Sequence, residues 1–338
     1  MNIIVDAFGG DNAPLEIIKG SVEAKNELGI DITFVGNEEI IRKVSKENDI
    51  NIDGIKIVHA DSVISQNEAG TEVMKSKKDS SMAVGLKLLH DGEGDAFVSA
   101  GNSGAICVGA TLIVKRIKGI KRPAFAPVIP TVEGSTMLLD SGANVECKPQ
   151  MLYQFGIMGS IYMEKVMGVK NPRVGLANVG SEPHKGGELQ LATYELLKNS
   201  KLNFVGNIEG RDMPVGGCDV CVADGFTGNI MLKTYEGVAE ALMTKLKGVF
   251  YKSLKNKLAA KVIYSDLKEM KKSIDYNEYG GAPIIGCAKP VFKAHGSAKA
   301  KTFKNAIRLT KEYVENNVVE AISTALKEYN EGDNASNG

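Results

Sequence analysis

Short apolar runs alternate with longer amphipathic runs along the chain. The apolar runs have the length and composition of β-strands, and they fall at residues 3–6, 32–36, 55–59, 95–99, 136–140, 174–178, 203–206 and 219–224. The amphipathic runs repeat apolar residues at helical spacing and predict helices at residues 15–28, 81–90, 104–116, 151–166, 188–198 and 302–328. The dominant pattern is therefore a strand followed by a helix.

This alternation predicts an α/β fold with three layers, α/β/α, built on a largely parallel sheet. The near-continuous apolar run at residues 220–223 fits a strand that is buried on both faces. No Pro/Ser-rich linker and no internal repeat interrupts the pattern. We therefore expect a single α/β domain over residues 1–330, followed by a flexible polar tail at residues 331–338.

The composition of the 338 residues is typical of a globular protein, with 43% hydrophobic and 24% charged residues. Basic and acidic residues number 41 each, so no overall charge favours nucleic acid, and we expect no nucleic-acid partner. The five cysteines have no disulfide spacing, Met1 leads directly into a strand without a signal-peptide pattern, and no apolar stretch reaches the about 18 residues of a membrane span. These features predict a cytoplasmic protein.

Five predicted strands end in small polar loops that expose the backbone. The loops contain Gly9, Gly10 and Asp11; Asn102 and Ser103; Gly142 and Asn144; Asn178 and Gly180; and Asp224, Gly228 and Asn229. Open α/β sheets bind ligands at the carboxyl ends of their strands, and glycine lets the backbone approach a ligand closely. The helices that follow present N–H groups suited to an anion. Each loop alone is explained by an ordinary turn, but five together predict an anion-binding edge.

The chain lacks the common signatures of other chemistry. It has no P-loop, no dinucleotide fingerprint, no nucleophile elbow and no H-E-x-x-H zinc motif. Cys218 and Cys221 form a C-x-x-C, but we place both within the strand that ends at Asp224, where positions three apart point to opposite faces. We interpret them as buried structural cysteines with diverging sulfurs, and we expect no metal and no cofactor.

Three basic residues near the predicted ligand edge have two interpretations each. Lys185 lies in a Gly-flanked loop, where it is either solvated or a phosphate ligand. Arg211 is flanked by acidic residues and is either a site residue or a member of an ion pair. His295 follows an apolar, strand-like run and is either a site residue or structural.

In their order along the chain, the loop sequences resemble one known family. The set comprises DAFGGDNAP at residues 6–14, SAGNSGA at 99–105, RIKGIKRPA at 116–124, LDSGAN at 139–144, NVGSE at 178–182, KG at 185–186, DGFTGNIMLK at 224–233, YGGA at 279–282 and AHGS at 294–297. Over residues 1–326 the chain closely resembles the PlsX family, the bacterial phosphate acyltransferases that start phospholipid synthesis. Phe8 stands where the family often has Met, and Pro183 and His184 form a variable insert.

The resemblance implies a fold similar to the isocitrate/isopropylmalate dehydrogenases and the phosphate acetyltransferases, and a homodimer. It implies that a fatty acyl group passes from acyl carrier protein to inorganic phosphate, giving acyl phosphate and free carrier protein. A membrane glycerol-3-phosphate acyltransferase that uses the acyl phosphate is the implied downstream partner. Phosphate is already an anionic nucleophile, so this reaction needs orientation and oxyanion stabilisation rather than a Ser-His-Asp array.

For this reaction, Lys185 is our candidate for binding phosphate and stabilising charge. Asn229 is our candidate donor to the oxyanion or to the departing thiolate. The other residues expected at the substrate and phosphate site are Gly9, Gly10, Asp11, Asn102, Ser103, Gly142, Asn144, Asn178, Gly180, Asp224, Gly228 and His295. Of the carboxylates, we expect Asp6, Asp11 and Asp224 to orient loops rather than to act as bases.

Residues at about 240–275 have the pattern of a protruding basic arm. Between Lys245 and Lys272, nine lysines and two acidic residues give a net charge of +7, and apolar residues recur at helical spacing. This pattern predicts two basic amphipathic helices. Their apolar faces would pack on the core or on a dimer mate, which is the structural interpretation. In the functional interpretation they contact an anionic membrane or the acidic carrier protein. The contact residues would be Lys252, Leu254, Lys255, Lys257, Leu258 and Lys261. A membrane contact would associate the protein peripherally with the inner face of the cell membrane.

Three other functions remain open at this point. The first is a phosphate acetyl- or butyryltransferase that acts on short acyl-CoA, and the second is a non-catalytic protein that organises a membrane or a partner. The third, a dehydrogenase, follows from fold analogy alone and lacks a nicotinamide fingerprint.

Overall fold

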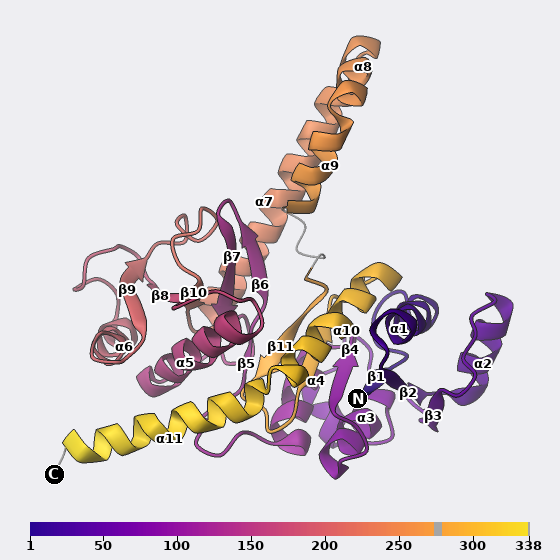
Figure 1. Cartoon of the computed structure of the whole chain (residues 1–338), viewed down its shortest axis with the longest axis horizontal. Coiled ribbons are helices and arrows are strands. Elements are labelled where there is room, and N and C mark those ends of the chain that lie inside the picture. Colours follow the sequence, from indigo (N-terminus) through magenta and orange to yellow (C-terminus); the bar gives the residue numbers. More distant parts are fainter. Residues whose placement is uncertain (274–278, 337–338) are drawn as a thin grey trace.

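The computed structural model describes the backbone of residues 1–273 and 279–336, and the side chains of residues 1–270 and 279–328 (Figure 1). The strands are β1 (Asn2–Asp6), β2 (Asp31–Gly36), β3 (Lys56–His59), β4 (Ala96–Ser99), β5 (Ala124–Phe125), β6 (Val128–Thr131), β7 (Gly134–Leu139), β8 (Arg173–Ala177), β9 (Asn203–Ile208), β10 (Val220–Val222), β11 (Gly281–Ile285) and β12 (Val291–Ala294). The helices are α1 (Leu15–Leu28), α2 (Glu38–Glu47), α3 (Ser81–Asp91), α4 (Ser103–Gly109), α5 (Pro149–Lys165), α6 (Glu188–Lys198), α7 (Gly225–Tyr251), α8 (Leu254–Val262), α9 (Tyr264–Ser273), α10 (Ala300–Glu315) and α11 (Val318–Ser336). A 3-10 segment at Gly70–Met74 and a π-helical segment at Ala110–Val114 complete the regular structure.

The strands form two sheets, whereas the sequence predicted one. The first sheet has the order β3-β2-β1-β4-β12-β11-β5, and the second has the order β6-β7-β10-β8-β9. Both are mostly parallel, with antiparallel pairs at β12-β11, β11-β5 and β6-β7. The α/β class is therefore confirmed. The number of sheets was wrong because β12, late in the chain, pairs with β4 across nearly two hundred intervening residues, a contact that local periodicity does not encode.

Each sheet is covered by helices on both faces. In β1, Ile3 and Val5 join a hydrophobic cluster with residues of α1 and α10, while Ile4 joins a different cluster with residues of α3. In the second sheet, Val220 faces α5, while Cys221 faces the cluster that contains Leu232 of α7. This alternation is the period of two expected of a strand, and it produces the three-layer arrangement.

One hydrophobic cluster contains residues of both sheets. Tyr162 of α5 lies 6.0 Å from Tyr313 of α10, measured between ring centroids, and Tyr313 lies 5.4 Å from Phe292 of β12. This shared packing supports our proposal that residues 1–330 form one domain. The backbone of α11 is helical through residues 331–336, which the sequence assigned to a flexible tail.

Two predicted helices are interrupted. The helix predicted at 302–328 divides into α10 and α11 at Asn317, whose φ of 50° is left-handed, a conformation that Asn adopts more readily than most residues. The helix predicted at 104–116 changes from α to π geometry after Gly109 and ends before Lys115, whose φ is 72°.

The prediction for the C-x-x-C pair is partly wrong. Both cysteines are free and fully buried, as expected of structural cysteines. However, β10 begins at Val220, so Cys218 precedes the strand and the alternation of faces does not apply to it. Both thiols lie in the same hydrophobic cluster, and a hydrogen bond with Cys218 is the largest of the causes that raise the pKa of the Cys221 thiol.

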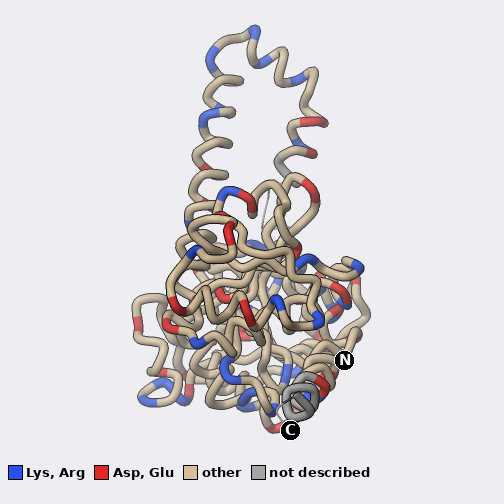
Figure 2. Tube along the Cα trace, turned by 90° about the vertical axis from the view of Figure 1, so that its left-hand side faces the viewer, with Lys and Arg blue, Asp and Glu red and all other residues tan. Residues whose placement is uncertain are grey.

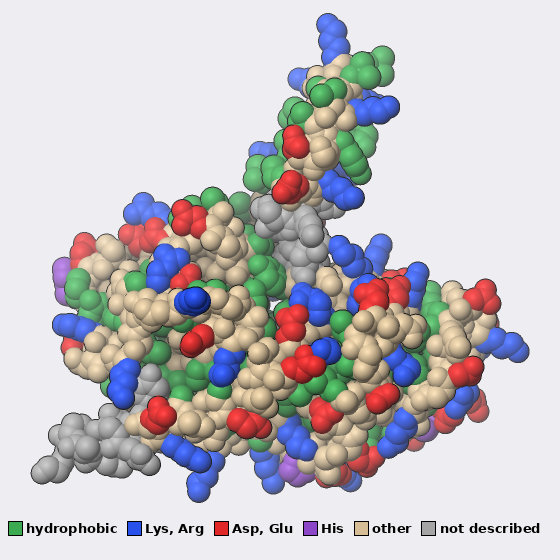
Figure 3. Space-filling view, viewed as in Figure 1, with side chains coloured by type: hydrophobic (Ala, Val, Ile, Leu, Met, Phe, Trp, Pro, Cys, Tyr) green, Lys and Arg blue, Asp and Glu red, His purple; other side chains and the backbone are tan. Residues whose placement is uncertain are grey.

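The outer half of α7, together with α8 and α9, extends from the body as an arm (Figure 1). Lysines are spaced along it (Figure 2), and hydrophobic side chains lie between them on its surface (Figure 3). Leu254, Leu258 and Val262 of α8 are 78%, 65% and 83% exposed. In the part of the chain that the structure describes, no helix is both long and apolar enough to cross a membrane.

Candidate active site

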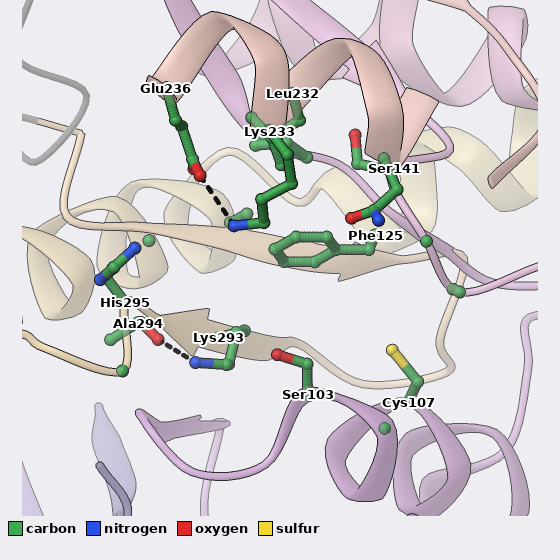
Figure 4. Close-up of a pocket in the computed structure, with 18 of the residues that line it drawn as sticks. Ser103, Cys107, Phe125, Ser141, Leu232, Lys233, Glu236, Lys293, Ala294 and His295 are labelled. Carbon is green, nitrogen blue, oxygen red and sulfur yellow. Dashed lines mark hydrogen bonds and ion pairs between the residues drawn. The ribbon is translucent and has the colours of Figure 1, made fainter. Parts of the chain in front are cut away.

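A cavity of about 670 Å³ lies where loops of the two sheets meet (Figure 4). The first sheet contributes the loops after β1, β4 and β12, represented by Asp11, Ser103 and His295. The second sheet contributes the loops after β7 and β10, represented by Gly142 and Asn229. The carboxyl ends of parallel strands thus face each other across the cavity, which is the place where such folds bind ligands.

The structure brings only some of the predicted site residues to this cavity. Those that line it are Asp11, Ser103, Gly142, Asn229 and His295. Those that do not are Gly9, Gly10, Asn102, Asn144, Asn178, Gly180, Lys185, Asp224 and Gly228. Several members of the second group hold the lining loops in place.

Helix α7 approaches the loop after β7 very closely. A Cβ atom at Gly228 would lie 2.0 Å from the backbone oxygen of Asp140, so only glycine allows this approach. Asp224 is the N-cap of α7, and its carboxylate accepts hydrogen bonds from the backbone N–H and the hydroxyl of Thr227 at 2.9 and 2.7 Å. The close contact of α7 with this loop places Asn229 beside Gly142. A Cβ atom added at Gly142 would lie 3.5 Å from Asn229 Oδ1.

Asp140 organises the loop after β7. Its carboxylate is fully buried and accepts hydrogen bonds from the backbone N–H groups of Phe125, Ala143 and Asn144 and from the Asn144 side chain, at 2.6 to 3.1 Å. Burial raises the pKa of this carboxyl above its usual value, and the hydrogen bonds oppose the increase. Asn144 therefore holds the loop, and its predicted contact with a ligand stays a prediction.

Asn102 has a similar supporting role on the first sheet. Its Oδ1 caps α4 by accepting from the Ala105 N–H at 3.0 Å, and its Nδ2 donates to the backbone oxygens of Ser65, Gln66 and Glu68. At Gly10 the φ of 99° requires glycine. The next residue, Asp11, donates its N–H to Gly296 O at 2.8 Å, which joins the loops after β1 and β12.

Two lysines that were given no role from the sequence line the cavity (Figure 4). Lys233 of α7 forms an ion pair with Glu236 at 2.7 Å. Lys293 of β12 is only 7% exposed, and its Nζ donates to the backbone oxygens of Ala294 at 2.6 Å and Ala100 at 3.3 Å. The sequence contains one sign that Lys293 is a site residue: it interrupts the otherwise apolar run 291–294, and lysine is rarely buried without a reason.

The cysteine that lines the cavity is not an activated nucleophile. Burial raises the pKa of the Cys107 thiol to about 12, so this cysteine is protonated at neutral pH. Burial also lowers the pKa of His295, whose Nδ1 lies 2.8 Å from Ser297 Oγ. Lys293 has its pKa lowered to about 8 by burial.

Lys185 lies on the loop after β8, and in the second sheet β10 separates β8 from β7. Asn178 Nδ2 donates to the backbone oxygen of Lys185 at 3.0 Å, so Asn178 holds this loop. The predicted contact of Lys185 with phosphate stays a prediction. Arg211 forms an ion pair with Glu209 at 3.1 Å. Of its two interpretations, site residue or member of an ion pair, the structure therefore shows the second.

Comparisons with known proteins agree with the sequence motifs. The profile of a family described as "Fatty acid synthesis protein" matches residues 1–321. A phosphate acyltransferase of Thermoanaerobacterium thermosaccharolyticum is 49% identical, with 97% of each chain covered, and one of Clostridioides difficile is 43% identical, with 98% of each chain covered.

Solved structures show the same fold at low identity. A phosphotransacetylase of Streptococcus pyogenes superposes with a TM-score of 0.61 at 16% identity, covering 93% of this chain and 94% of that one. A branched-chain phosphotransacylase of Enterococcus faecalis has a TM-score of 0.57 at 13% identity, covering 93% of this chain and 99% of that one. The fold of the phosphotransacylases is therefore confirmed, and the profile and the close relatives together show that the chain belongs to the PlsX family of phosphate acyltransferases.

Proposed function

We propose that this protein transfers a fatty acyl group from the thioester of acyl carrier protein to inorganic phosphate. The observation that best supports it, beside the family, is the cavity, which offers amide and hydroxyl groups and lysines from two facing sheets. Among the described residues that line it, Cys107 is protonated rather than a thiolate, because its pKa is about 12. Such a site suits a reaction in which the substrate is itself the nucleophile.

The reaction has two bond changes at one carbon. A phosphate oxygen attacks the thioester carbonyl carbon and forms the new C–O bond, while the carbonyl electrons move onto oxygen. When the tetrahedral intermediate collapses, the C–S bond breaks, and sulfur leaves with the electron pair and takes up a proton. The protein must hold phosphate over one face of the thioester carbonyl and stabilise the transient oxyanion.

Asn229 is the proposed donor to this oxyanion. Its amide lines the cavity beside Gly142 at the start of α7, where the helix presents its positive end. The rigid seating of α7, through Gly228 and the Gly225 N–H bond to Asn144 O at 2.8 Å, would keep the donor in place without reorganisation.

A donor-choice assay tests the proposed function. Purified protein is given inorganic phosphate with either palmitoyl-acyl carrier protein or acetyl-CoA and butyryl-CoA, and the released thiol and the acyl phosphate are measured. We expect rapid phosphate-dependent release of carrier-protein thiol. Preferred release of CoA would instead indicate a short-chain phosphate acyltransferase, and binding of carrier protein without turnover would indicate a non-catalytic organiser.

The arm supports finer proposals about partners and location. We assign to it a contact with the acidic carrier protein or with anionic lipid at the inner face of the cell membrane, where the glycerol-3-phosphate acyltransferase would receive acyl phosphate. Its surface carries Lys252, Lys255, Lys257 and Lys261 around exposed Leu254 and Leu258. We retain the homodimer as part of this proposal.

Leu254→Glu and Leu258→Glu are each expected to weaken binding to anionic vesicles by at least about tenfold, because each removes a side chain worth about 1.5–3 kcal/mol on burial and adds a repelled charge. Vesicle flotation at low and high salt measures this. Val132→Glu is the control, since Val132 is 81% exposed in the turn between β6 and β7 and is not part of the arm. Unchanged flotation of both arm variants would remove membrane insertion from the proposal.

A further inference from the structure

Lys293 is a buried ammonium group without a carboxylate partner among the residues that the structure describes. Two of its three N–H donors are directed at neutral backbone oxygens, those of Ala294 and Ala100. The other lysine of the cavity, Lys233, has a side chain that is 60% exposed and is neutralised by Glu236. Asp11 and Asp6 act on its charge and raise its pKa, but burial outweighs them. A buried cation that forms no ion pair is unfavourable, and an anionic ligand would relieve this cost.

We propose that Lys293 Nζ binds the inorganic phosphate substrate and supplies the positive charge that holds it against the thioester. This inference rests on the proposed function and names the phosphate subsite within it. Lys293 and Ser103 both line the cavity, and both belong to the first-sheet side (Figure 4). Phosphate oxygens accept hydrogen bonds from both group types.

The two walls of the cavity then have different tasks. The first sheet, through Lys293 and Ser103, holds the phosphate. The second sheet, through Asn229 on α7, faces the acyl carbonyl. In this arrangement phosphate approaches one face of the carbonyl from the first-sheet wall, while the oxyanion develops towards Asn229 on the other wall.

The protonation of Lys293 makes the subsite sensitive to pH. Burial lowers the pKa of Lys293 to about 8, and the charged or titratable groups that face it are Asp6, Asp11, Cys107, Lys233 and His295. Of these, Cys107 has a pKa of about 12 and His295 a pKa below its usual value, so neither changes charge near pH 8.

Below pH 8 Lys293 is a cation and binds phosphate. Above pH 8 it loses its proton, and phosphate affinity is expected to fall about tenfold per pH unit.

Calorimetric titration of the full chain with inorganic phosphate, from pH about 7 to about 9.5, tests the subsite without an acyl donor. Wild-type affinity is expected to fall above pH 8. Lys293→Met is expected to weaken binding at pH 7 about ten- to a hundredfold, as for loss of a hydrogen bond to a charged group, and to lack the fall above pH 8. KM for phosphate with palmitoyl-acyl carrier protein should rise in parallel.

Lys289→Met is the matched control. Lys289 also donates to a backbone oxygen, that of Leu89 at 2.8 Å, but it lies outside the cavity, so phosphate binding should be unchanged. If Lys293→Met does not fold, the wild-type profile decides alone, and an affinity that stays flat from pH 8 to 9.5 overturns the subsite. The subsite would also be overturned if Lys185→Met weakened phosphate binding and Lys293→Met did not.

The same measurements separate this inference from the proposed function. Phosphate binding that depends on Lys293, without turnover of any acyl donor, would retain the subsite and refute the acyltransferase function. The opposite result is also possible: the protein turns over acyl carrier protein, but Lys293→Met leaves the KM for phosphate unchanged. That result would retain the acyltransferase function and refute the subsite.

Discussion

Replacing Gly228 with alanine is expected to lower kcat/KM by about a hundredfold or more, because the start of α7 can no longer sit against the loop after β7. The new Cβ would lie 2.0 Å from the backbone oxygen of Asp140, and backbone cannot rotate away as a side chain can. The helix must shift, and a displacement of about 1 Å at a catalytic group is enough for a loss of this size. Steady-state kinetics with acyl carrier protein and phosphate measures it.

The same substitution should lower the free energy of unfolding by about 1–3 kcal/mol, the usual cost of overpacking. Gly237→Ala is the matched control in the same helix, since beyond the backbone of its own helix turn and its chain neighbours nothing lies within 4 Å of its Cβ position. There alanine should preserve activity and add up to about 1 kcal/mol of stability, because glycine is a poor helix former. Urea unfolding of both variants checks this, and full activity of Gly228→Ala would contradict the proposed seating.

Replacing Asn229 with alanine is expected to lower kcat about a hundred- to a thousandfold, the range for loss of one oxyanion donor. KM for phosphate should change little, because the donor acts on charge that develops only in the transition state. Asn229→Asp should be at least as damaging, since an ionised carboxylate has no N–H to donate and repels the oxyanion.

Ile230→Ala is the control for this series. Ile230 is the next residue of α7, is 50% exposed and does not line the cavity, so kcat should be retained. Single-turnover measurements show whether the chemical step itself is slowed. An Asn229→Ala protein with near-native kcat would exclude Asn229 as the oxyanion donor.

The candidate site could be predicted from sequence where its signal is local. Gly142 and Asn229 were found because a strand that ends in a Gly/Asn loop before a helix has a recognisable pattern. Lys185 has the same local pattern, yet β8 lies beyond β10, and its loop does not line the cavity. Lys293 lacks the pattern because it lies inside a strand, and only the pairing of β12 with β4 brings it beside Ala100.

The sequence by itself determined the α/β class, the positions of most strands and helices, the basic arm and the family. These features depend on periodicity, turn chemistry and motif order, which are written in neighbouring residues. The tertiary structure alone decided that there are two sheets, that a cavity lies between them, and that Lys293 rather than Lys185 lines it. Those outcomes depend on contacts between distant residues, such as Gly228 with Asp140 and Lys293 with Ala100, where packing and burial select among loops that look alike in sequence.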